Sequence, residues 1–486
     1  MRSGRLLCAL AAFAVPAGVY IACAPIEPAS WDSAELQGVP YILGITHPTG
    51  FPFYVLAGYI WSHALVLGSV AWRMNAMSGA AMAVASVAAY GVAIEFGASA
   101  PVALFATLWF AFTQNVWSHA IRAEAHDLAV ACCAVAIYAF VRWMHGGDNR
   151  WFLAAFALCG LGMAAHPNAL WILPVLALGA TIAPRRPRFA LAAGAAALVI
   201  AGLALYVYLP LRSSYIVRHQ LDPTAGLAGV NGGIFWNYNN PSTLRGLANE
   251  LTGSETQTPS YFLASFNPVH VASAVETFVE TIAAEYGVPA AVLLLGGLIA
   301  AVRRDWRATL VVCVACTAAL LFSVVYPNES DVGRYRMLVS WLAVPLFGAL
   351  TPRSRGPAAV ALHGVLVMAL LAAAAAAFAH RDSYFSHRDV AGGRWVILAV
   401  RPYVPPGSII VTGWLDATSL AYGAYVDGSL LGRTVVSDDL LEVPRYQIWA
   451  RWRPVFVLVN PHDAAVNGAT DVATLDPYHE LYQVKP

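Results

Sequence analysis

The chain has 486 residues, of which 59% are hydrophobic and only 11% are charged. Soluble domains carry about a quarter charged residues, so this composition excludes an ordinary soluble protein and indicates a membrane protein. The formal net charge of +1 also argues against nucleic acid as the partner, because that partner requires a strongly basic surface.

Apolar segments of the kind that cross membranes as helices recur along the chain. They are predicted at 5–25, 52–70, 75–96, 101–117, 124–144, 151–166, 168–184, 189–210, 284–302, 308–327, 335–351 and 357–379. The first segment has a basic start and ends in Ala22-Cys23-Ala24, so a cleaved signal peptide is an alternative there. Because this segment is long for a signal peptide, we expect it to be retained as the first membrane helix.

Arginines predict which ends of these segments face the cytoplasm, since arginine is enriched in short cytoplasmic loops. Four arginine clusters are therefore placed inside: Arg2/Arg5, Arg185/Arg186/Arg188, Arg303/Arg304/Arg307 and Arg353/Arg355. Arg73 is also inside by this rule, yet five segments separate it from Arg185, and an odd number cannot return the chain to the same side. We expect about eleven crossings, with 101–117 crossing incompletely because it is short and ends in a polar run.

This topology divides the chain into a membrane domain, 1–379, and an extracytoplasmic tail, 380–486. The membrane domain carries outer loops at 26–51 and 211–283. Four polar segments then lie at the outer face: 26–50, 118–127, 166–168 and 328–336. Polar groups gathered at a membrane edge are the main indication of a functional site.

The first outer loop holds the strongest candidates. Asp32 and Glu35 are three residues apart and share one face if the segment is helical, and His47 follows in a stretch rich in turn formers and aromatics. A carboxylate placed there has the chemistry to take a proton from a hydroxyl acceptor. The alternative is that Ser30 caps a short helix whose first turn holds the two acids.

The segment before 124–144 packs Arg122, Glu124, His126 and Asp127 into six positions. Charge at a membrane edge is costly unless it is paired, so a local ion pair accounts for part of this segment. The alternative is that Arg122 or His126 binds a phosphate while Glu124 orients an acceptor. His166 is a weaker candidate, because a histidine that caps a helix end satisfies the same sequence.

Arg212 opens the large outer loop, and Asn240 lies further along it in an Asn-rich stretch. Arginine at a membrane exit ordinarily contacts lipid headgroups, but its planar fork also binds phosphate through two parallel hydrogen bonds. Arg334 lies in a short outer loop of acidic and basic residues, where ion pairing and ligand binding both remain open.

The tail has the composition of a small soluble α/β domain. Buried strands are predicted at 408–412 and 455–459, with a helix at 417–425 between them. All seven cysteines lie in apolar stretches, so neither a disulfide framework nor a metal site is predicted. We expect the tail to serve recognition or packing.

These pieces, in this order, resemble the GT-C superfamily of membrane glycosyltransferases. Within it, they resemble a family, built on a domain of uncharacterised function, whose animal member O-mannosylates plexin-type receptor domains. The matching residues are Asp32-Ser33-x-Glu35, Gly44-Ile45-x-His47-Pro48-x-Gly50-x-Pro52-x-Tyr54, Arg73-x-Asn75-x-x-Ser78, Trp117, Glu124-x-His126, His166, Leu209-Pro210-Leu211-Arg212, Asn240-Pro241 and 406–412. Relatives often carry Gly-Asp where this chain has Trp414-Leu415-Asp416, a departure expected to bear on the tail only.

The resemblance implies an all-α polytopic bundle with a small extracytoplasmic α/β domain. It also implies an inverting transfer of a sugar, most simply mannose, from a polyprenyl phosphate to a protein or glycan hydroxyl. Asp32 matches the general base of such enzymes. Glu35 would either support it or bind the acceptor, Arg212, His47 and His126 would be candidates for the lipid phosphate, and the remaining candidates would bind the substrates. The lipid phosphate leaves already charged, so no metal is required in principle, and dependence on a divalent metal is left open.

Two other functions use the same features. A transporter or flippase for a lipid-linked sugar would need intramembrane acids and a large apolar bundle, but its typical inverted repeat is not visible in the sequence. A polysaccharide ligase would use a lipid pyrophosphate donor and commonly lacks an α/β tail. The near absence of lysine, with Lys485 the single example, favours a bacterial plasma membrane as the location, with the site facing outside.

Overall fold

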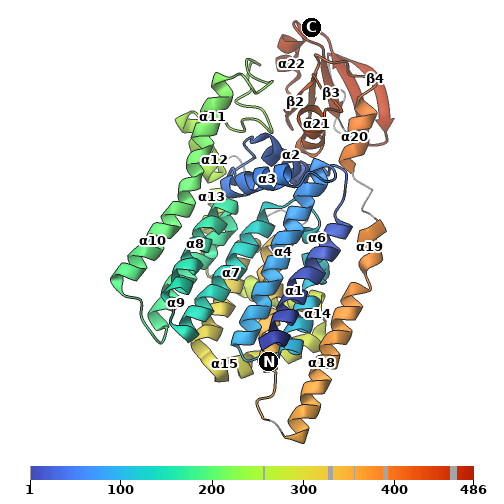
Figure 1. Ribbon diagram of the computed structural model, residues 1–486. Helices are drawn as coiled ribbons and strands as arrows, with labels where there is room; N and C mark the ends of the chain where they lie inside the picture. The colour runs from blue at the N-terminus through green and yellow to red at the C-terminus, as the bar shows by residue number, and fades with distance from the viewer. Residues whose placement is uncertain (1, 255–257, 327–331, 355, 387–391, 460–467) are drawn as a thin grey trace. The chain divides into compact units, whose positions relative to one another are not determined.

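The computed structural model describes residues 2–254, 258–326, 332–354, 356–386, 392–459 and 468–486, which group into two compact units. One unit consists of Met1–Cys23, Ser78–Leu205 and Gln257–Phe385. The other consists of Ala24–Met77, Tyr206–Thr256 and Ser386–Pro486. We call them the helical unit and the mixed unit (Figure 1).

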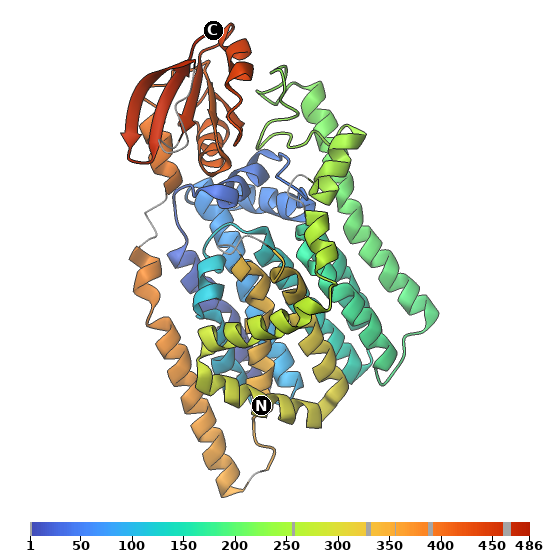
Figure 2. The same cartoon turned by 180° about the vertical axis from the view of Figure 1, so that it is seen from behind.

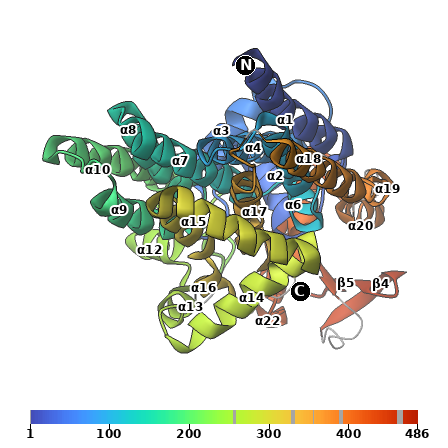
Figure 3. The same ribbon diagram turned by 90° about the horizontal axis from the view of Figure 1, so that it is seen from below.

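The helical unit is built from the apolar segments. Its helices are α1 (Arg2–Cys23), most of α4 (Val70–Glu95), α5 (Ala100–Ala111), α6 (Gln114–Ala120), α7 (Ala125–Gly146), α8 (Asn149–Ala165), η1 (Pro167–Trp171), α9 (Ile172–Ile182), α10 (Phe189–Leu203), α13 (Thr258–Ala264), α14 (Val269–Tyr286), α15 (Val288–Thr317), α16 (Leu320–Ser323), η4 (Val332–Arg336), α17 (Met337–Ala349), α18 (Pro357–Phe378) and α19 (Arg381–Ser386). Seen from below, α8 lies between α7 and α10 and packs on both (Figure 3).

Six stretches of the described residues are long and apolar enough to cross a membrane as helices: Ser3–Cys23, Val70–Glu95, Ala125–Gly146, Phe189–Arg218, Val288–Ser323 and Pro357–Tyr384. Shorter apolar helices occupy Ala100–Ala111, Asn149–Ala165 and Pro167–Ile182. The longest stretch contains a break at Asp305, where φ is −155°. This break separates the two segments predicted at 284–302 and 308–327, and the total of about eleven crossings stays a prediction.

The segment predicted at 101–117 forms two helices in place of one. α5 ends at Ala111 after 12 residues, and α6 begins at Gln114. Twelve residues reach about 18 Å, which is shorter than the roughly 30 Å of membrane hydrocarbon. The length agrees with an incomplete crossing, which remains a prediction.

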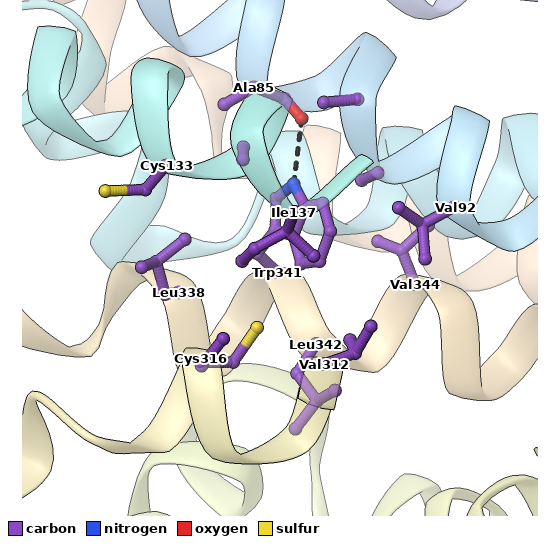
Figure 4. Close-up of a cluster of buried hydrophobic side chains, with 14 of the residues drawn as sticks. Ala85, Val92, Cys133, Ile137, Val312, Cys316, Leu338, Trp341, Leu342 and Val344 are labelled. Carbon is purple, nitrogen blue, oxygen red and sulfur yellow. Dashed lines mark hydrogen bonds between the residues drawn. The ribbon is translucent and has the colours of Figure 1, made fainter. Parts of the chain in front are cut away.

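The core of the helical unit centres on α17, whose side chains are all buried. Figure 4 shows Trp341 of α17 among apolar side chains of α4, α7 and α15, including Val92, Ile137 and Val312. Its indole N–H donates a hydrogen bond of 2.8 Å to the backbone oxygen of Ala85. A buried indole needs such a partner, so this bond lets a large aromatic occupy the middle of the bundle.

The mixed unit combines helices of the outer loops with the tail. It contains α2 (Trp31–Ile42), α3 (Pro52–Ala64), the first residues of α4, α11 (Tyr208–Arg218), α12 (Leu244–Thr252), α20 (Gly392–Val400), β1 (Ile409–Thr412), α21 (Trp414–Tyr425), β2 (Thr434–Ser437), α22 (Val443–Ala450), β3 (Val455–Val459), β4 (Ala469–Asp476) and β5 (His479–Val484), while η2 (Ala204–Val207) joins the units. The strand order is β2-β1-β3-β5-β4. β1 pairs in parallel with β2 and β3, β5 pairs antiparallel to β3, and β4 pairs antiparallel to β5 at the edge of the sheet (Figure 2).

Helix α21 joins the tail to the first outer loop within this unit. It packs against β1 and β2 and also against α2, which in turn packs against α3. The backbone N–H of Ala71 donates to the hydroxyl of Tyr422, and the hydroxyl of Ser419 donates to the backbone oxygen of Ala29. The strands and helix predicted in the tail are confirmed. The expected division of the chain at residue 380 stays a prediction.

Candidate active site

Helix α2 carries the two acids of the first outer loop. Ser30 occupies its N-cap position with an extended backbone, but within the described residues its side chain accepts no capping hydrogen bond. The capping explanation of Ser30 therefore finds no support in the geometry. Asp32 lies in the first turn and Glu35 one turn later, so the two carboxylates share the face that turns toward His47.

The buried Glu35 pairs with His47, whose side chain is 22% exposed. The Glu35 side chain is 0% exposed, and its Oε1 accepts a 2.8 Å hydrogen bond from the backbone N–H of His47. Its Oε2 makes a short contact with Nδ1 of the same histidine. Both carboxylate oxygens are therefore engaged by one residue, which suits Glu35 to hold the loop and orient the imidazole ring.

Asp32 is the more accessible acid. Its side chain is 28% exposed, and its Oδ2 lies 4.0 Å from Nε2 of His47. Its Oδ1 accepts a 2.8 Å hydrogen bond from the indole N–H of Trp414, the first residue of α21. Since Glu35 is fully buried and Asp32 is not, Asp32 is the carboxylate better placed to meet a substrate.

The charges in this cluster favour an imidazolium at neutral pH. Burial disfavours the charged ring, but the carboxylates of Glu35 and Asp32 outweigh it and raise the pKa of His47 to about 9. Burial also raises the pKa of the Glu35 carboxyl, and the neighbouring histidine opposes that rise. The cluster thus places a positive ring between two acids. A third acid, the buried Glu250, also raises the pKa of His47.

Arg212 lies on α11 and binds the end of α2. Its Nε donates to the backbone oxygen of Leu43 at 2.5 Å, and its Nη2 donates to that of Ile42 at 3.1 Å. Leu43 has a left-handed backbone, φ 53°, that ends the helix and turns these carbonyls outward. Arg212 therefore supports the C-terminus of the helix that carries Asp32, whatever else it binds.

Asn240 organises the outer loop that follows α11. Its Oδ1 accepts hydrogen bonds from the hydroxyls of Ser213 and Ser242 and from the amide of Asn237. Neighbouring Asn239 donates to Glu250 at 3.1 Å. The side chain of Asn240 thus shapes the loop in this structure, and its expected contact with substrate stays a prediction.

The helical unit gathers a second set of candidates. Glu124 is buried between two arginines: Oε1 lies 3.0 Å from Nε of Arg122 and Oε2 3.5 Å from Nη1 of Arg334. Its backbone N–H donates to the hydroxyl of Ser78. The local ion pair that was one alternative for this segment is present between Arg122 and Glu124. Arg334, 210 positions later in the chain, joins it. Part of the polar segment 328–336, namely 328–331, lies outside the described residues.

His126 and His166 face each other in the same unit. Their ring centroids are 3.5 Å apart, and Tyr335 packs edge-on against His126 at 5.1 Å. Nδ1 of His166 accepts a hydrogen bond from the backbone N–H of Asn168, which is the helix-end role that the sequence offered as an alternative. Two neighbouring histidines and an aromatic ring thus form a compact cluster within an apolar bundle.

The predicted residues therefore fall into two groups. Asp32, Glu35, His47, Arg212 and Asn240 belong to the mixed unit, whereas Arg122, Glu124, His126, His166 and Arg334 belong to the helical unit. The expectation that both groups lie at the outer face of the membrane stays a prediction. Among the described residues, no group of three or more His, Cys, Asp or Glu side chains is arranged to hold a metal ion.

Sequence reasoning missed Trp414 and Glu250. The expectation that Trp414 bears on the tail only is wrong, because its indole N–H contacts Asp32. The only sequence feature that pointed to Trp414 was that relatives often carry Gly-Asp where this chain has Trp414-Leu415-Asp416. Nothing in the local pattern marked Glu250, a single acid in a short helix.

Comparisons with known proteins agree with the resemblance seen in the sequence. Residues 32–187 match the family described as "Protein O-mannosyl-transferase TMEM260 N-terminal domain". The chain is 28% identical over 252 residues to the mouse (Mus musculus) Protein O-mannosyl-transferase TMEM260, covering 50% of this chain and 34% of that protein. A relative from Dictyostelium discoideum with the same name is 23% identical over 285 residues, covering 55% and 33%. The chain spans about a third of the length of these curated relatives.

Solved structures show the fold. ArnT from Cupriavidus metallidurans in the apo state aligns with a TM-score of 0.52 and 12% identity, covering 97% of this chain and 98% of that one. ArnT bound to undecaprenyl phosphate aligns with a TM-score of 0.50 over the same shares. The helical GT-C fold expected from the sequence is thereby confirmed.

Proposed function

Because this GT-C protein is similar in sequence to protein O-mannosyl-transferases, we propose that it is an inverting glycosyltransferase that uses a polyprenyl-phosphate sugar. The observation that carries the proposal is the partly exposed carboxylate of Asp32, which lies beside the imidazole of His47 and is held by Trp414. Asp32 is also where the family match begins. An oriented acid at this position is what a transfer to a hydroxyl group requires.

In the proposed reaction Asp32 takes the proton of an acceptor hydroxyl. The hydroxyl oxygen then attacks the anomeric carbon of the sugar from the face opposite the phosphate. A new carbon–oxygen bond forms, the bond from the anomeric carbon to the phosphate oxygen breaks, and the polyprenyl phosphate leaves with both bonding electrons. Attack from the opposite face inverts the anomeric configuration.

The donor and acceptor are inferred from relatives. The curated relatives are named for O-mannosyl transfer to protein, and ArnT has been solved with undecaprenyl phosphate. We infer that this chain transfers mannose from a polyprenyl phosphate to a hydroxyl of a protein or glycan. Arginine and histidine side chains suit the phosphate and Glu124 suits the acceptor, so we propose Arg122, Arg212, His47 and His126 as the candidates for the phosphate.

The chain is an integral membrane protein, as its apolar helices and its membrane-protein neighbours show. We infer in addition that the site faces away from the cytoplasm in a plasma membrane. The arginine clusters in the short loops support this orientation, because they favour the cytoplasmic side.

Transfer from a labelled donor tests the proposal. Sealed right-side-out membranes that contain the protein should move radiolabelled mannose from polyprenyl phosphate to a membrane-impermeant acceptor peptide rich in serine and threonine. Inverted membranes should not, because the site would face the lumen. Repeating the assay with polyprenyl-phosphate glucose and with polyprenyl-phosphate arabinose identifies the sugar. Repeating it with a chelator tests whether transfer depends on a divalent metal. Label that crosses the membrane while still on the lipid would show a flippase and contradict the proposal.

The role of Arg212 in donor binding gives a separate prediction. We expect Arg212→Lys to raise the donor concentration for half-maximal rate by about 10-fold or more, since a point charge replaces a two-pronged contact. Arg218→Lys, on the same helix but exposed, is the matched control and should leave this concentration unchanged. If Arg212→Lys lowers thermal stability but leaves the donor concentration for half-maximal rate unchanged, Arg212 only stabilises the C-terminus of α2 and does not bind the donor.

A further inference from the structure

Trp414 is held in place by three different neighbours. It follows β1 directly through Gly413, and its backbone N–H donates a 3.0 Å hydrogen bond to Oδ1 of Asp439. A Cβ at Gly413 would lie 2.8 Å from that same oxygen, so any other residue there would displace the Asp439 side chain. The indole ring packs edge-on against His47 and Tyr238, each at 5.8 Å. The ring therefore has one defined orientation.

That orientation presents the indole N–H to Asp32. The bond to Oδ1 is 2.8 Å long, and an indole nitrogen can only donate. A proton on Oδ1 would weaken this bond, because a hydroxyl oxygen is a poorer acceptor than a carboxylate oxygen, so the bond favours keeping Oδ1 unprotonated. Oδ2, on the side of the His47 ring, is then the oxygen that takes up a proton.

We propose that Trp414 is a positioning residue of the transfer reaction, whose indole N–H holds Oδ1 of Asp32 so that Oδ2 receives the proton of the acceptor hydroxyl. The inference rests on the proposed function and deepens it. It gives the C-terminal segment a part in catalysis, because the residue that orients the base comes from α21, at the carboxyl end of β1. Ligand sites in open sheets commonly gather at this end of parallel strands.

Trp414→Phe removes the N–H and keeps an aromatic ring against His47. We expect kcat to fall roughly 10-fold or more, the change that accompanies loss of a hydrogen bond to a charged group, with little change in the KM for the donor. The acid limb of the kcat/KM profile should move to higher pH, because the N–H stabilises the ionised carboxylate. The other groups that face Asp32, namely His47 and Glu35, remain in place. Trp452→Phe, in an exposed part of the same segment, is the matched control and should alter neither quantity.

A second readout does not depend on transfer. The loss of thermal stability caused by Trp414→Phe should be largest near neutral pH, should shrink in acid as Asp32 becomes protonated, and should be nearly absent in the Asp32→Ala background, which offers no oxygen to the indole N–H. A wild-type kcat in Trp414→Phe, a lowered kcat with an unmoved acid limb, or a stability loss that is independent of pH would each overturn the positioning role. If the stability loss follows Asp32 but no donor supports transfer in the wild type, the contact stands, and both the proposed function and the catalytic role fail.

Discussion

Asp32→Asn should leave the chain folded and inserted while transfer falls by about 10²-fold or more, because positioned proton transfer typically contributes 10² to 10⁴. Asparagine has nearly the same shape, and its side-chain oxygen can still accept the bond from Trp414. What it cannot do is take up a proton. The measurement is the initial rate with the polyprenyl-phosphate donor, normalised to the amount of folded protein recovered from the membrane.

The alternative role of Asp32 as a helix-terminus charge gives a different result. As a first-turn charge, Asp32 would contribute at most about 1 kcal/mol, and asparagine would retain much of that. Activity would then persist. Near wild-type transfer by Asp32→Asn, together with loss of transfer per folded molecule of Glu35→Gln, would exchange the roles of the two acids. If neither substitution affects transfer, the assignment of this loop to catalysis is wrong.

Local patterns in the sequence predicted the pieces of this site well. The spacing of Asp32 and Glu35 predicted a shared helix face, and both acids indeed approach the same histidine. The buried strands of the tail were equally readable, since runs such as Val455–Val459 are apolar throughout and short. In each case the prediction depends only on the spacing of a few neighbouring residues, which helix or strand periodicity determines.

Contacts between distant parts of the chain were not predictable in the same way. Trp414 meets Asp32 across 382 positions, and Arg334 meets Glu124 across 210. Such pairs depend on how α21 packs against α2, or how η4 packs near α6, which no local pattern encodes. From the sequence alone, Trp414 at the start of a helix cannot be distinguished from an ordinary apolar residue, because nothing nearby indicates its contact with Asp32.

Helix ends were also set by details that composition does not show. The apolar segment predicted at 52–70 ends as a helix at Ala64, and the next helix begins at Val70. Arg73 stabilises the intervening turn by donating to the backbone oxygens of Ser62, Val66 and Gly68. The topology prediction placed Arg73 on the cytoplasmic side and the tail outside, but the backbone N–H of Ala71 donates to Tyr422 of the tail, so the two lie on the same side of a membrane and the two assignments cannot both be right.

Glu35→Gln should strongly destabilise the mixed unit. Removing one partner of a buried ion pair typically costs about 3–5 kcal/mol, and we expect the lower end here because His47 is 22% exposed and keeps Asp32 4.0 Å away. The double variant Glu35→Gln/His47→Gln should recover much of this loss, because it leaves no unpaired charge behind. Thermal unfolding of the purified protein in detergent, followed for both variants beside the wild type, measures the difference.

The effect should depend on pH with a definite sign. The pKa of His47 is raised from an ordinary 6.5 to about 9 in the folded chain, so its favourable contribution is complete below about pH 6.5. That contribution is lost as the pH rises toward 9, where the folded protein also gives up the proton. The gap in stability between wild type and Glu35→Gln should therefore be widest near pH 6 and narrow steadily up to pH 9. A gap that stays constant over this range would mean that His47 is already neutral at pH 6, and that Asp32 works without a charged neighbour.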